Sequence, residues 1–432
     1  MNNNKSEFEM LFSEKLTENG DASFNTTGNN LLDILFMSEY YTKHLDEVPF
    51  IGHDDKAKLF AMFMRDPRSG MGRRDLGRRL LKDTLCDSRQ ILKCGRADDL
   101  WMIFKDTKDW HHILDVIKMA IDDNREIAPL LKKWLPRYSS KNLMVAREIA
   151  AYWGMNKQQY GHYVKVDTVE NTMSRKMWES IEFDKLPSLA AIKYVKAFQR
   201  HQPERYEQYL EDVRSGKKQL HVATTTVYDI YRNRTSIDPD VFYSKIEKIS
   251  GSWIPVIDVS GSMYDSNDSI GKALSIGKYL SDCSTYCPNQ FLTFSRTPEL
   301  VTQRGSSYND ILDNIRNANW GGNTDFGAVM DLLGRLKTSF PEWIIVLSDM
   351  EFDYGSRDSK DNAMAKLRSN GANTKILWWN FNSRATTAPE TDKYGNVFMS
   401  GYNPMLLEFL EAGFDGIQFL NRLLEEYAKQ IS

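Results

Sequence analysis

Two hydrophobic patterns divide the chain at about residue 250. From 31 to 233 the apolar positions recur at helical spacing, most clearly in 55–64, 76–92, 110–122, 141–153 and 189–201. Proline and glycine punctuate these stretches, which predicts roughly ten helices of modest length joined by short turns. Antiparallel helix pairs stacked on one another give this kind of pattern. The first half is therefore predicted to be a helical-repeat domain.

After residue 250 short apolar runs alternate with helical stretches. Strands are predicted at 253–258, 290–294, 299–303, 343–348, 375–381 and 397–400, and helices at 269–284, 308–317, 326–338, 361–369, 404–411 and 416–431. The runs WIPVI and WIIVL are apolar throughout, as in parallel strands buried on both faces. Segment 299–303 follows 290–294 too closely for a crossover helix, so we expect an antiparallel edge strand. The pattern predicts a doubly wound, mostly parallel α/β sheet.

These patterns give four segments: a polar arm over 1–30, the helical-repeat domain over 31–235, a linker helix over 236–250 and the sheet domain over 251–432. Asp238 and Pro239 open the linker helix as cap and first-turn proline. No apolar run approaches the roughly twenty residues of a membrane span. The start, MNNNKSEFEM, lacks the apolar region of a signal peptide. We expect a cytoplasmic protein whose four cysteines stay reduced.

The overall net charge of −3 hides an asymmetry between segments. Residues 1–50 carry −6, residues 51–250 carry +9, and residues 251–432 carry −6. The basic middle is the expected contact for a polyanion. Within it, 65–82 reads RDPRSGMGRRDLGRRLLK, and arginine offers bidentate geometry to phosphate. The RNA-binding candidates are Arg68, Arg73, Arg74, Arg78, Arg79 and Lys82. The alternative is a solvated helix face paired with Asp75, Asp83 and Asp87.

Oxygen-bearing side chains follow the ends of two predicted buried strands. The first strand ends in Asp258-Val259-Ser260-Gly261-Ser262, and the second ends in Ser348-Asp349. Between them lies the glycine-rich loop Gly321-Gly322-Asn323-Thr324-Asp325. Hard oxygen ligands at the carboxyl end of a central strand suit a Mg²⁺-type ion. The alternative is that Ser260 and Ser262 only cap the next helix and that Asp349 is an ordinary turn residue.

These three elements, in this order, resemble the metal-ion-dependent adhesion site of von Willebrand factor A domains. The resemblance covers about residues 250–432 and implies one Mg²⁺ (or Mn²⁺ or Ca²⁺). It implies Ser260, Ser262 and Thr324 as direct ligands. By the same resemblance, Asp258 and Asp349 hold the ion directly or through water.

A second resemblance concerns the helical half together with this domain. The GMGRRD turn and the Gly95–Trp101 element GRADDLW, followed by an A domain, resemble the Ro autoantigen and telomerase-component (TROVE) class. There a ring of HEAT-like helical repeats binds RNA. The chain resembles more closely a less characterised family of plants, fungi and viruses with the same layout. WIIVLSDMEFD (343–353), ILWWNFN (376–382) and SGYNP (400–404) are typical of its C-terminal segment.

We expect a non-enzymatic binding protein. Asp258-Val259-Ser260 lacks the second aspartate of a phosphatase-type nucleophile motif, and no G-x-S-x-G elbow or phosphate loop occurs. Two carboxylates would neutralise a divalent ion, whose open position then suits an acidic side chain. Such a partner is another protein, a second copy of the chain or the acidic arm. RNA binding by the basic helices is the second expectation. The alternative is a structural or particle-assembly protein that binds no RNA.

Overall fold

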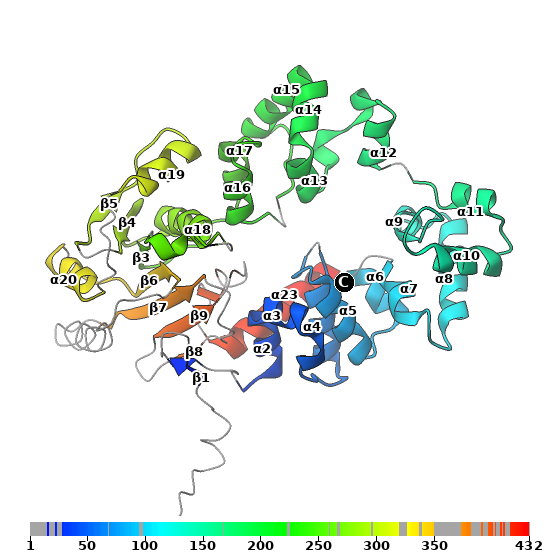
Figure 1. The fold of residues 1–432 in the computed structure, drawn as a ribbon, viewed down its shortest axis with the longest axis horizontal. Helices are drawn as coiled ribbons and strands as arrows, with labels where there is room; N and C mark the ends of the chain where they lie inside the picture. The colour runs from blue at the N-terminus through cyan, green and yellow to red at the C-terminus, as the bar shows by residue number, and fades with distance from the viewer. Residues whose placement is uncertain are drawn as a thin grey trace, which may run out of the picture. The chain divides into compact units, whose positions relative to one another are not determined.

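The computed structural model describes residues 15–16, 22–23, 28–67, 69–94, 98–166, 168–222, 225–258, 260–265, 268–294, 297–318, 326–336, 339–349, 373–381, 390–391, 396–400, 402, 407, 409–410 and 415–431. Two compact units emerge from its contacts. The first comprises 1–40 and 184–420, and the second comprises 41–183 and 421–432. This division follows compactness, whereas the segments predicted above follow element type. Figure 1 shows the elements along the chain.

The part of the chain before the sheet is almost entirely helical in the described residues. A short hairpin, β1 (Lys15–Leu16) and β2 (Ala22–Ser23), precedes it. The helices up to residue 163 are α2 (Asn30–Phe36), α3 (Ser38–Lys43), η1 (Leu45–Glu47), α4 (Asp55–Arg65), α5 (Arg74–Asp83), α6 (Ser88–Cys94), α7 (Asp98–Phe104), α8 (Trp110–Asp122), α9 (Ala128–Trp134), α10 (Leu143–Tyr152) and α11 (Lys157–Tyr163). They continue as α12 (Val169–Ser174), η2 (Trp178–Ser180), η3 (Phe183–Lys185), α13 (Ser188–Lys193), α14 (Val195–His201), α15 (Pro203–Arg214), α16 (Val227–Asn233) and α17 (Pro239–Tyr243).

Three helix predictions need correction. The single helix expected over 76–92 is two helices, because Leu85 adopts a left-handed φ of 58° between α5 and α6. The stretch 189–201 is also two helices, α13 and α14, which meet at Tyr194. The linker helix is shorter than expected. Asp238 caps it by accepting from the Val241 amide, as predicted, but it ends at Tyr243.

The second half of the chain forms a seven-stranded sheet with the order β5-β4-β3-β6-β7-β9-β8. Its strands are β3 (Trp253–Ile257), β4 (Gln290–Thr293), β5 (Leu300–Thr302), β6 (Trp343–Ser348), β7 (Lys375–Asn380), β8 (Glu390–Thr391) and β9 (Val397–Ser400). Strands β4, β3, β6, β7 and β9 run parallel, whereas β5 pairs antiparallel with β4 at one edge, as expected. The two-residue edge strand β8 had no counterpart in the sequence analysis.

Helices cover both faces of this sheet (Figure 1). The remaining elements are η4 (Gly261–Met263), α18 (Ser269–Cys283), α19 (Tyr308–Arg316), α20 (Phe326–Leu336) and α23 (Gly416–Ile431). On one face Val256 and Val346 pack with Leu333 of α20 in a single apolar cluster. On the other face α18 approaches closely at Gly277, where a Cβ would lie 2.4 Å from Ile257. The predicted fold class is therefore confirmed: a helical region followed by a mostly parallel sheet with helices on both faces, as in von Willebrand factor A domains.

Helix α23 is divided between the two units, and each of its parts makes aromatic contacts within its own unit. In the first unit Phe419 lies 6.4 Å from Phe36 of α2, ring centroid to ring centroid. In the second unit Tyr427 meets Phe63 of α4 edge-on at 5.4 Å and donates to the Asp66 carboxylate at 3.1 Å. Some other predicted elements, such as the helix at 361–369, lie outside the described residues. In the part of the chain that the structure describes, we find no helix with the length and apolar character of a membrane span.

Candidate functional site

The pairing of β3 with β6 brings the two predicted acidic segments together. Ile257 lies opposite Leu347 in this parallel pair, so both strands end at the same edge of the sheet. The Asp258 amide donates to the Leu347 carbonyl at 3.0 Å. The Ser348 hydroxyl donates to Asp258 Oδ2 at 2.6 Å. The two segments, about ninety residues apart in sequence, are therefore one structural feature.

The turn after β3 holds the two candidate hydroxyl ligands beside this edge. The Ser260 amide donates to Asp258 Oδ1 at 2.8 Å, which fixes the carboxylate and the start of the turn. Oγ of Ser260 and Oγ of Ser262 lie 3.0 Å apart, within hydrogen-bonding distance. Both serines are partly exposed, whereas Met263 is fully buried and anchors η4. The two hydroxyls thus lie on one side of a fixed turn, within reach of solvent.

The site combines buried acids with accessible hydroxyls. Asp258 is 0% exposed and Asp349 is 4% exposed. Burial raises the pKa of Asp258 from 3.8 to about 6, and the charge of Asp349 adds to this rise, while hydrogen bonds from Ser348 and Ser260 oppose it. Two carboxylates close together and out of water favour either a proton or a cation. The donor set of carboxylate and hydroxyl oxygens fits Mg²⁺, Mn²⁺ or Ca²⁺.

One predicted ligand, Thr324, lies outside the described residues together with its whole loop, 319–325. Its role as a ligand stays a prediction. The described residues hold no group of three or more His, Cys, Asp or Glu side chains arranged as metal ligands. The oxygen set after β3 and β6 has two described carboxylates, Asp258 and Asp349, and its other described donors are hydroxyls.

Several residues that fix the position of this turn were not predicted from the sequence. Ser348 was noted only as a strand end, although its position beside Asp349 was a usable signal. Asp265 accepts from both the amide and the hydroxyl of Ser269, at 2.9 and 2.8 Å, and so fixes the start of α18. Tyr228 of α16 donates to Asp268 Oδ2 at 2.9 Å. No local pattern reveals this last bond, because the two residues lie forty positions apart.

The arginine segment, residues 65–82, is largely neutralised by carboxylates. Arg65 is 1% exposed; its Nε lies 2.8 Å from Oδ2 of Asp99, and its Nη2 donates to Oδ1 at 3.1 Å. Arg78 donates to Asp99 at 2.6 Å and to Asp98 at 2.5 Å, and Arg74 reaches Asp98 at 3.4 Å. The GMGRRD turn contributes Arg74 and the GRADDLW element contributes Asp98 and Asp99, so these two sequence motifs meet in one group of ion pairs. We call Arg65, Arg74, Arg78, Asp98 and Asp99 the ionic cluster below.

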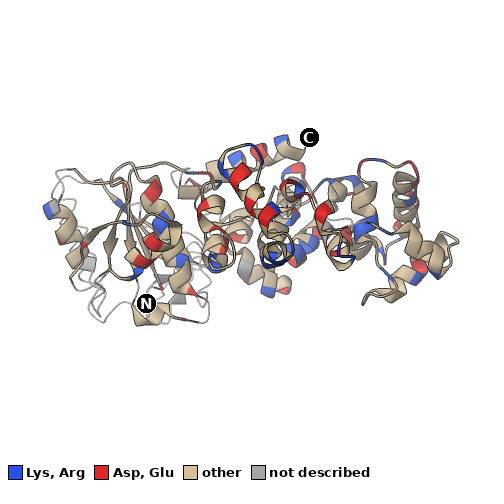
Figure 2. Cartoon of the chain, turned by 90° about the horizontal axis from the view of Figure 1, so that it is seen from above, with Lys and Arg blue, Asp and Glu red and all other residues tan. Residues whose placement is uncertain are grey.

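The candidate RNA-binding residues differ in how accessible they are. Arg78 is only 10% exposed inside the ionic cluster, so it is committed to carboxylates rather than to solvent. Arg79 is 45% exposed and pairs with Asp83 at 2.5 Å, one of the partners that the alternative interpretation named. Lys82 is exposed, Arg73 is partly buried, and Arg68 lies outside the described residues. Acidic and basic residues are interspersed over the helices (Figure 2).

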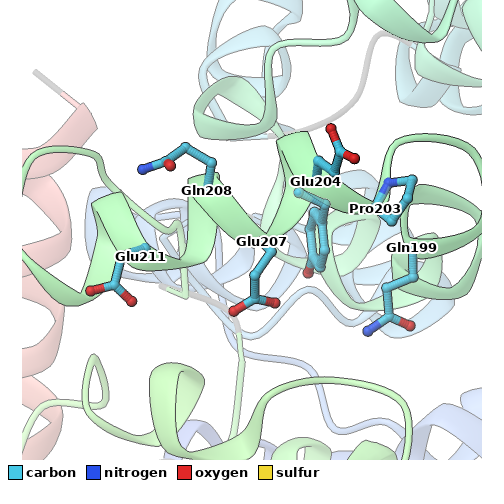
Figure 3. Close-up of a pocket in the computed structure, with 7 residues that line it drawn as sticks. Gln199, Pro203, Glu204, Glu207, Gln208 and Glu211 are labelled. Atoms are coloured by element: carbon cyan, nitrogen blue, oxygen red, sulfur yellow. The ribbon is translucent and has the colours of Figure 1, made fainter.

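A separate acidic hollow lies on α14 and α15. Its lining residues are Gln199, Pro203, Glu204, Tyr206, Glu207, Gln208 and Glu211. Glu207 and Glu211 project from one side of α15 (Figure 3), and Arg214 pairs with them at 3.3 and 3.0 Å. The hollow contains none of the candidate metal ligands or RNA-binding residues. Because Arg214 already pairs with two of its three acids, we assign it no function.

Comparison with known proteins finds two family models, one viral relative and one similar solved structure. A model described as a domain of unknown function (DUF7788) matches residues 252–426, and another (DUF2828) matches residues 157–249. An uncharacterised protein of Acanthamoeba polyphaga mimivirus is 23% identical and covers 95% of this chain and 87% of its own length. The chain therefore has a viral relative with which both halves align, as the second resemblance implied.

Among solved structures, the crystal structure of the Ro (RSR) protein of Deinococcus radiodurans is similar at 11% identity. It covers 94% of this chain and 96% of its own, with a TM-score of 0.42. The fold assignment depends on the strand order and the helices described above.

Proposed function

We propose that the protein is a non-enzymatic binding protein that holds one divalent cation at the carboxyl edge of its sheet. Asp258, Ser260, Ser262, Thr324 and Asp349 are the proposed ligands, directly or through water. One observation carries the proposal. The buried Asp258 carboxylate is fixed between Ser348 and the Ser260 amide, next to two hydroxyls 3.0 Å apart. A cation there would offset the unfavourable burial of two acids.

The proposed binding mode follows from the charge of this site. Two aspartates neutralise a divalent ion, so a carboxylate from a partner at the open coordination position leaves the site with only one net negative charge. We propose an Asp or Glu of a partner protein as that ligand, with a second copy or the acidic arm as alternatives.

The test removes both hydroxyls, in the variant Ser260→Ala/Ser262→Ala. We expect at least tenfold weaker binding of Mg²⁺ and Mn²⁺ by isothermal titration calorimetry, because loss of even outer-shell partners weakens metal sites by about 10- to 100-fold. The matched control, Ser174→Ala/Ser180→Ala, removes two exposed hydroxyls that bond only backbone carbonyls. It should bind as the wild type does. Equal affinities in all three proteins would rule out the assignment.

We propose in addition that the helical region binds RNA, because residues 51–250 carry a net charge of +9. Release of counterions from phosphates should make the affinity fall steeply with salt. We expect the wild type to retain single-stranded RNA in a filter assay at about 50 mM salt and to lose it progressively towards about 200 mM. No retention at the lower concentration would contradict RNA binding and would favour a structural or assembly role.

A further inference from the structure

The second unit carries a basic surface that the arginine segment does not include. Residues 132–165 contain seven Lys or Arg and a single acid, Glu148, a net charge of +6. These cations are Lys132, Lys133, Arg137, Lys141, Arg147, Lys157 and Lys165. Among the described residues, none of the seven forms an ion pair with a carboxylate. Glu148 instead accepts from the indole of Trp110 at 2.6 Å.

Partly exposed aromatic rings lie between these cations. Trp153 meets Tyr163 edge-on at 5.6 Å and lies 6.1 Å from Tyr160, which meets Tyr138 at 5.8 Å. Tyr160 is buried, but the other three rings of this series are partly exposed. The rings belong to α11 and to the segments on either side of α10 (Figure 1). They therefore form one continuous series of aromatic side chains across neighbouring elements.

Lysines lie at both ends of the series. The Lys132 ammonium is 5.7 Å from the centre of the Tyr163 ring, and the Lys157 ammonium is 5.9 Å from that of Tyr138. Lys118 also lies over Tyr163, at 5.9 Å, but it pairs with Asp122. We call Lys132, Lys157, Tyr138, Trp153 and Tyr163 the Lys–aromatic surface. Cations over ring faces keep the rings and the charges within a few ångströms of each other.

The plain alternative is a solvated basic face with no ligand. Like charges close together repel, and in the arginine segment carboxylates offset this repulsion. There Arg78 is buried against two aspartates. Residues 132–165 form no such ion pairs, although the charge of Asp122 acts on Lys132 and its carboxylate accepts from Tyr163 at 2.7 Å. A polyanion is the complementary partner for the remaining positive charge. Partly exposed aromatic rings favour nucleic acid over other polyanions, because they stack on unpaired bases. An acidic peptide has no bases and gains no such contact.

We propose that the Lys–aromatic surface binds single-stranded nucleic acid, with phosphates at the lysines and bases against Tyr138, Trp153 and Tyr163. This inference rests on the proposed binding of RNA by the helical region. It places the RNA contact on α9–α11 and not on the arginine segment. Bases meet the rings through their faces, so we expect tolerance of sequence and preference for unpaired strands.

The electrostatic test compares two variants with the same change in charge. The first, called the surface variant, replaces the two lysines of the Lys–aromatic surface and two further lysines of 132–165: Lys132→Gln, Lys157→Gln, Lys133→Gln and Lys165→Gln. The control replaces four exposed cations elsewhere: Lys196→Gln, Arg200→Gln, Lys217→Gln and Lys218→Gln. Affinity for an RNA of about 12 nucleotides is measured against salt. The slope should fall by up to roughly 3 in the surface variant, at about 0.7 per lost phosphate contact, and stay unchanged in the control.

The stacking test separates nucleic acid from other polyanions. Tyr163→Leu removes a ring and should weaken binding of oligonucleotides, RNA or DNA, roughly five- to hundredfold, whereas Tyr163→Phe keeps the ring and should bind like the wild type. Polyglutamate should bind equally to all three. If Tyr163→Leu binds RNA normally, or the surface variant keeps the wild-type slope, the inference is wrong while RNA binding stands. If wild type binds no RNA at all, the proposed function itself fails.

Discussion

Replacing Asp258 by Asn should make the cation-free protein more stable at neutral pH and abolish its stabilisation by Mg²⁺. The pKa of Asp258 in the folded state, about 6, lies above the ordinary value of 3.8. The folded state therefore binds the proton more tightly than the unfolded state does. The stabilisation from this proton is complete below about pH 4 and is lost as the pH rises through about 6. At neutral pH the buried charge lowers stability by about 3 kcal/mol, which Asn removes.

Thermal unfolding with a chelator and with excess Mg²⁺ measures both effects. With chelator, Asp258→Asn should unfold at a higher temperature than wild type at about pH 7.5 and at nearly the same temperature at about pH 4. Mg²⁺ at about a hundred times its Kd should stabilise wild type by about 2.7 kcal/mol and leave the variant unchanged. Asp310→Asn, an exposed acid beside Ser306, is the control and should respond to Mg²⁺ normally. A variant stabilised by Mg²⁺ as much as wild type would contradict the role of Asp258.

Replacing Asp99 by Asn should lower the free energy of unfolding by about 3–5 kcal/mol, as when one partner of a buried ion pair is removed. Asp99 is fully buried and faces Arg65 and Arg78, at 2.8 and 2.6 Å. Without its charge, the buried guanidinium of Arg65 has lost its counter-ion. Urea unfolding, monitored by hydrogen exchange of the α4 amides, reports on this unit directly.

Two further variants sharpen this comparison. Asp83→Asn breaks the exposed pair with Arg79 and should lower stability by no more than about 1 kcal/mol. Arg65→Met combined with Asp99→Leu removes both charges and should recover much of the lost stability, because apolar pairs replace buried ion pairs well. Equal losses for Asp83→Asn and Asp99→Asn, or no recovery in the double variant, would show that the ionic cluster does not stabilise the helices.

Hydrophobic pattern alone predicted most of the fold because buried parallel strands and amphipathic helices have distinct periods. The runs WIPVI and WIIVL became β3 and β6, and the short spacing before 299–303 correctly indicated an antiparallel edge. Helix ends were less predictable. Leu85 breaks the helix expected over 76–92 with a left-handed φ that this residue type rarely adopts, so its sequence gave no warning.

The candidate metal site was partly predictable, because strand ends in a parallel sheet converge on one edge. Asp258, Ser260 and Ser262 were identified from their spacing, whereas the bond from Tyr228 to Asp268 depends on how α16 packs against α18. The basic residues show the same limit. Arg79 pairs with Asp83 four positions away, a helical spacing that can be recognised in the sequence. Arg78 pairs with residues about twenty positions away, which no local spacing indicates. Charge density alone could not separate the arginines that pair with carboxylates from the lysines of 132–165, which form no ion pair in the described residues.

A crystal structure of the full chain grown with Mn²⁺ tests the central claim most directly. Anomalous scattering locates the ion without any assumption about its ligands. We expect one Mn²⁺ at the carboxyl edge of β3 and β6, with the hydroxyl oxygens of Ser260 and Ser262 ~2 Å away and Asp258 and Asp349 bound to it directly or through water. We also expect a Thr324 oxygen in the coordination sphere. Ordered protein with no anomalous peak at this edge, or a peak held by other residues, would contradict it.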